Sequence, residues 1–176
     1  MWATRQLLEV HRLRDRGENA AAFKLATEIA PLLAGQVDEA DIWAGFSLAV
    51  DISTDPAGAR LYRQPLDANR DDWEDLGTTP LNGVRFPEFT TYRIRFELDG
   101  YHPVELLQEA VVGAQWRGQP PLSPVVMDPA DQFPAEMVRL PGFNHDLVDY
   151  DDYRMDRFEV SNRKFAAFIA AGGYAP

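Results

Sequence analysis

Three histidines are the candidates for metal binding or proton transfer in this sequence: His11, His102 and His145. No two of them stand at a spacing that places two imidazoles on one face of a helix. The acidic run that follows His145 lacks the glycine and the terminal glutamate of a known calcium loop. We therefore expect a solvated acidic loop there, and neither a metal site nor a cofactor in this chain.

Nucleophilic chemistry has equally little support. The sequence contains no cysteine, which excludes disulfides, thiolate nucleophiles and cysteine-ligated metal centres. None of the serines stands in a Gly-x-Ser-x-Gly elbow. Ser161 precedes a helical pattern, so it is better explained as a helix cap than as a nucleophile. We predict no catalytic residue in this chain.

Four aromatic residues are candidates for a surface that binds a protein or binds sugars by stacking of the rings. They are Trp73, Tyr92, Tyr101 and Trp116. The alternative is that these rings fill the core of a small β-domain, where aromatic side chains are common.

The charge balance argues against polyanionic partners. The chain has 17 basic and 28 acidic residues, a net charge of -11, so a nucleic acid backbone or an anionic membrane surface would be repelled. We find no run of about 18 apolar residues that could span a bilayer. The segment Met1–Arg5 leads into an amphipathic pattern and does not resemble a signal peptide, which leaves a cytoplasmic or an envelope-facing location open.

Residues 1–45 are expected to form a helical hairpin. Leu7, Leu8 and Leu13 give the first helix, over 4–16, an apolar stripe. Asn19 is the expected N-cap of the second helix. In that helix apolar residues recur every three or four positions, namely Phe23, Ala26, Ile29, Ala30 and Leu33. A short third helix is expected near 38–43.

Residues 46–112 are expected to form a small antiparallel β-sandwich. Alternating residues predict a strand from 46 to 53, followed by a tight turn that returns the chain antiparallel through 60–63. The clearest strand has Tyr92, Ile94, Phe96 and Leu98 on one face. Further strands are expected at 73–78 and 104–112.

The rest of the chain divides into a connector and a short C-terminal part. Residues 113–134 are rich in proline and glycine and predict an extended connector. In 135–176 we expect a short apolar segment, a weak strand at 153–160, and a helix that begins near Ser161 and ends at Gly172-Gly173. That helix has no visible partner for Phe165, Phe168 and Ile169. The fold class is therefore α+β.

Three motifs follow one another in the β-region, namely Pro56-Ala57-Gly58-Ala59, Leu76-Gly77-Thr78-Thr79-Pro80-Leu81 and Gly100-Tyr101. With these motifs in this order, the region resembles the PEGA module of bacterial proteins. Ala57 replaces the glutamate that names the family, and residues 63–75 are a long insertion. The resemblance implies a β-sandwich adaptor, often near a cell envelope, without catalysis.

The last forty or so residues contain three further motifs, namely Glu136–Gly142, Met155–Asn162 and Gly172-Gly173-Tyr174. With these motifs the segment resembles the start of a sulfatase-modifying-factor domain, the formylglycine-generating enzyme family with its C-type-lectin-like fold. Ser161 stands where threonine is usual, and one glycine replaces a pair after Pro141. The resemblance implies that the rest of such a domain follows, with any copper or iron and the oxidising cysteines located there.

This order of parts is similar to that of bacterial chains that begin with a serine/threonine kinase domain, although no kinase motif is present here. We expect a non-catalytic adaptor whose partner is the remainder of its own C-terminal domain. One alternative is a module that binds an envelope polymer or a protein. The other is that the parent protein is a metal-dependent oxidase or oxygenase.

Overall fold

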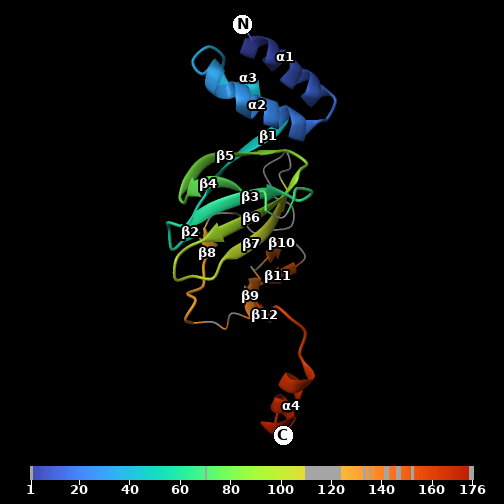
Figure 1. Ribbon diagram of the computed structural model, residues 1–176, viewed down its shortest axis with the longest axis vertical. Helices are drawn as coiled ribbons and strands as arrows, with labels where there is room; N and C mark the ends of the chain where they lie inside the picture. Colours follow the sequence, from blue (N-terminus) through green and yellow to red (C-terminus); the bar gives the residue numbers. More distant parts are fainter. Residues whose placement is uncertain are drawn as a thin grey trace. The chain divides into compact units, whose positions relative to one another are not determined.

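The computed structural model describes residues 2–69, 71–109, 124–132, 134, 136–140, 143–145, 148–151 and 153–174. These residues form four α-helices and several small sheets, most of them antiparallel, so the chain is of the α+β class (Figure 1). The chain divides into two compact units. The first comprises 1–99 and 103–127, and the second comprises 100–102 and 128–176. None of the helices in the described part is long and apolar enough to cross a membrane.

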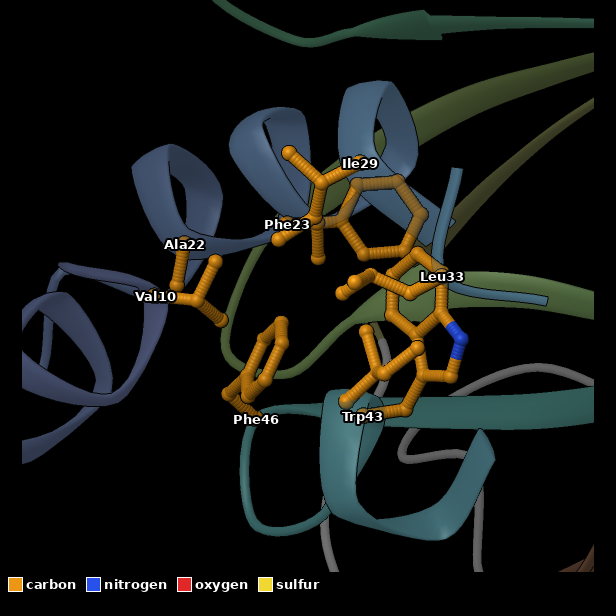
Figure 2. Close-up of a cluster of buried hydrophobic side chains, with 9 residues drawn as sticks. Val10, Ala22, Phe23, Ile29, Leu33, Trp43 and Phe46 are labelled. Atoms are coloured by element: carbon orange, nitrogen blue, oxygen red, sulfur yellow. The ribbon is translucent and has the colours of Figure 1, made fainter. Parts of the chain in front are cut away.

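The first unit begins with the predicted helical hairpin. Helix α1 spans Trp2–Asp15, α2 spans Asn19–Leu33 and the short α3 spans Glu39–Trp43. The buried side chains of these helices meet those of the residues just before the first strand (Figure 2). This cluster consists of Val10, Ala22, Phe23, Ala26, Ile29, Leu33, Ile42, Trp43 and Phe46. The periodicity predicted for α2 is confirmed, since four of its five apolar positions are buried and Ala30 packs against the cluster.

Two details of the hairpin differ from the prediction. Leu8 is exposed and Val10 is buried, because a helix turns about 100° per residue and the buried stripe runs through Leu7, Val10 and Leu13. Asn19 is not the N-cap of α2. It is the first helical residue, and its side-chain amide donates a hydrogen bond to the carbonyl of Glu88 at 3.2 Å.

The β-part of the first unit contains eight strands in the described residues. Their bounds are β1 Ser47–Ile52, β2 Thr54–Asp55, β3 Arg60–Pro65, β4 Glu74–Thr78, β5 Leu81–Pro87, β6 Thr91–Glu97, β7 Val104–Glu109 and β8 Val125–Val126. Strands β4, β3, β6 and β7 form one antiparallel sheet in that order, and β1 pairs antiparallel with β5. The predicted residues 110–112 of β7 and 113–123 of the connector lie outside the described residues.

The predicted hairpin between β1 and β3 is wrong. Strand β1 pairs with β5, whereas β3 pairs with β4 and β6. The segment between them carries the chain from one sheet to the other, and β2 within it pairs in parallel with β8. The hydroxyl of Thr79 fixes this segment, because it lies 2.6 Å from the Thr54 hydroxyl and accepts the backbone N–H of Ala59 at 3.0 Å.

Strand β6 confirms the clearest sequence pattern for three of its four apolar positions. Tyr92, Ile94 and Phe96 are buried and the residues between them are partly exposed, whereas Leu98 follows the end of the strand and is partly exposed. The Tyr92 ring meets Phe86 of β5 edge-on, with ring centroids 5.7 Å apart. The inner face of the four-stranded sheet therefore packs against the two-stranded sheet through aromatic contacts.

The described residues of the second unit form two short antiparallel strand pairs and one helix. Strand β9, Met137–Leu140, pairs with β12, Tyr153–Asp156, and β10, Phe143–His145, pairs with β11, Val148–Tyr150. Helix α4 spans Asn162–Ala170. Gly172 follows it with a positive φ of 83°, so the predicted glycine stop is confirmed.

Candidate functional site

The four candidate aromatic residues occupy different environments. Tyr92 is only 7% exposed, and burial raises the pKa of its hydroxyl. Its ring belongs to the core of the first unit. Trp73 is half-buried beneath the guanidinium of Arg95, which lies 5.9 Å from its ring centroid. Tyr101 belongs to the second unit, where it forms a β-bridge with Pro129, and Trp116 lies outside the described residues.

The histidines have structural neighbours in the described part of the chain. The Nε2 atom of His11 lies 3.0 Å from the carbonyl oxygen of Asp41, and the backbone N–H of His102 donates to the carbonyl of Asp128. The described residues contain no group of three or more His, Asp or Glu side chains that could hold a metal ion. The side chain of His145 is outside the described set.

A buried guanidinium, which the sequence analysis did not single out, joins the helices to the sheets. The Arg63 side chain, 7% exposed, lies on the inner face of β3 and forms two hydrogen bonds with Glu74 of β4, at 2.7 and 3.0 Å. It also donates to the carbonyl of Arg85. The two parallel hydrogen bonds pair the buried positive charge of Arg63 with the carboxylate of Glu74.

Arg63 is also surrounded by aromatic rings. Its guanidinium carbon lies 5.3 to 5.6 Å from the ring centroids of Phe23, Phe86 and Tyr92. Because Phe23 belongs to α2 and the other two rings belong to β5 and β6, one side chain contacts three elements. One feature of the sequence indicates this role. Arg63 stands two residues after Leu61, so both side chains point to the same buried face of the strand, where a charged residue is unusual. We assign Arg63 a structural role.

Helix α4 carries three large apolar side chains that are exposed to solvent. Phe165, Phe168 and Ile169 are 45%, 48% and 50% exposed, and none of the residues of α4 is buried. Phe165, Phe168 and Tyr174 gather their rings at centroid distances of 5.3 to 6.5 Å. A side chain on Gly173 would collide with the Phe168 ring at 2.3 Å, so glycine keeps this cluster closed. We call Phe165, Phe168, Ile169 and Tyr174 the α4 face.

Polar contacts define the start of α4 and connect it to neighbouring segments. The hydroxyl of Ser161 accepts the backbone N–H of Lys164 at 3.3 Å, which confirms the predicted cap. The Lys164 ammonium donates to Glu136 at 2.7 Å and lies 3.7 Å from Asp156. The hydrogen bond with Lys164 lowers the pKa of Glu136 and raises that of Lys164. These polar contacts lie on the surface and add little stability, and the aromatic side of the helix is open to solvent.

Comparisons with protein-family models, with curated proteins and with solved structures find no match to this chain. The resemblances to PEGA modules and to sulfatase-modifying-factor domains therefore rest on the sequence motifs alone. The α4 face is the candidate functional site because its chemistry, exposed aromatic and aliphatic carbon, is suited to protein contact.

Proposed function

We propose that this chain is a non-catalytic adaptor that ends in a docking helix. In this proposal the α4 face receives the remainder of a sulfatase-modifying-factor domain in a larger bacterial protein that is linked to a kinase. The observation that carries the proposal is the exposure of three large apolar side chains on a helix without a single buried residue.

The length of α4 supports a partner. Isolated helices shorter than about 12 to 15 residues are marginal in water, because the nucleation cost is recovered only by further turns or by tertiary burial. Helix α4 has 9 residues and its described environment buries none of them. A partner that buries its aromatic side would supply the tertiary stabilisation that this short helix lacks.

The composition of the α4 face supports a protein partner. Interface cores are enriched in aromatic residues, and a few such anchors usually provide most of the binding free energy. Phe165 and Phe168, three residues apart on α4, form such a cluster with Tyr174, which directly follows the glycine stop. The motif order Glu159-Val160-Ser161-Asn162 followed by Gly172-Gly173-Tyr174 favours a sulfatase-modifying-factor domain as that partner.

The test begins with the coding sequence that follows Pro176. Residues 1–176 and the polypeptide encoded directly downstream are produced separately, and their association is measured by calorimetry. We expect association, and we expect Phe165→Ala together with Phe168→Ala to weaken it about tenfold or more. Leu8→Ala removes an apolar side chain that is 59% exposed on α1 and should leave the affinity unchanged.

Two results would contradict the proposal. One is a stop codon directly after Pro176 in an intact gene. The other is an association that is equally strong with the double phenylalanine variant and with Leu8→Ala, since the α4 face would then not be the contact surface.

A further inference from the structure

We draw no further inference here: the strongest candidate, the apolar face of the β9–β12 strand pair with the half-exposed side chains of Tyr153 and Met155, carries no proposal because nothing in the described residues shows what covers it.

Discussion

Helices α2 and α4 are both short and amphipathic, but they differ in what covers their apolar side. In α2, the side chains of Phe23, Ala26 and Ile29 are enclosed by α1, α3 and the residue before β1. In α4, no residue is buried. Periodicity and end signals determine where a helix forms, whereas its stability in a protein comes mainly from the element that packs on it.

The largest expected effect concerns the core beneath α2. Phe46→Ala removes a completely buried ring from the cluster shared by the three helices, which should lower the free energy of unfolding by about 3 to 5 kcal/mol. Phe168→Ala on α4 removes the same group from a half-exposed site and should cost less than about 0.5 kcal/mol. Urea denaturation followed by circular dichroism measures both. Equal losses would show that α4 is packed as tightly as α2.

The next effect concerns the arginine that joins α2 to the sheets. Arg63→Ala removes two hydrogen bonds to Glu74 and the contacts with three rings, so it should cost about 2 to 4 kcal/mol. Arg60→Ala is the matched control, since Arg60 lies on the same strand and pairs with Asp75 of β4 but is 60% exposed. That surface pair is screened by solvent and should contribute far less than the buried pair. A similar cost for both variants would refute the structural role of Arg63.

The third effect is confined to α4. Ser161→Ala removes the side-chain acceptor for the Lys164 N–H, which should cost the helix about 1 kcal/mol. Because α4 has little tertiary support, we expect its backbone chemical shifts to move towards coil values while those of α2 stay unchanged. Ser161→Asp, which retains an acceptor, should preserve the helix. Loss of helical shifts in Ser161→Asp as well would argue against the cap.

The smallest effect is a dependence on pH at the junction of α2 with the β5–β6 loop. Burial raises the pKa of Glu88, so the folded state binds its proton more tightly than the unfolded state does. This group therefore reduces stability as pH rises from the unfolded pKa through the higher folded pKa. Glu88→Gln should be more stable than the parent near neutral pH and indistinguishable from it in acid. Thermal melts at several pH values provide the measurement, and an advantage that persists in acid would contradict this cause.

Much of the local structure could be predicted from the sequence. The spacing in α2, the alternation in β6, the cap at Ser161 and the glycine stop after α4 are short-range signals, and each determines backbone geometry within a few residues. The exposed apolar side of α4 was also predicted, because the sequence offered no element to cover it.

The pairing of strands was less predictable. Strand β5 carries Asn82, Gly83 and Pro87, so it lacks a clear two-residue pattern, yet it is the partner of β1. The turn residues 55–58 predict a change of direction but not the sheet that the chain enters next. That choice depends on long-range contacts, such as the Thr54–Thr79 hydroxyl pair.

The roles of the site residues also depend on long-range contacts that the sequence does not reveal. Aromatic composition suggested a ligand surface that included Tyr92, but burial of a ring depends on which side of the strand faces a second sheet. Arg63 was placed on a strand without a role, because its three aromatic neighbours come from distant segments.

Native-state hydrogen exchange on the 176-residue chain tests the central contrast most directly. The amides of α2 and β6 should exchange only through near-global unfolding, whereas those of α4 should exchange orders of magnitude faster through local opening. Addition of the polypeptide encoded downstream should slow exchange in α4 alone. If the α4 amides of the isolated chain are as well protected as those of α2, the helix does not need a partner and the docking account is contradicted.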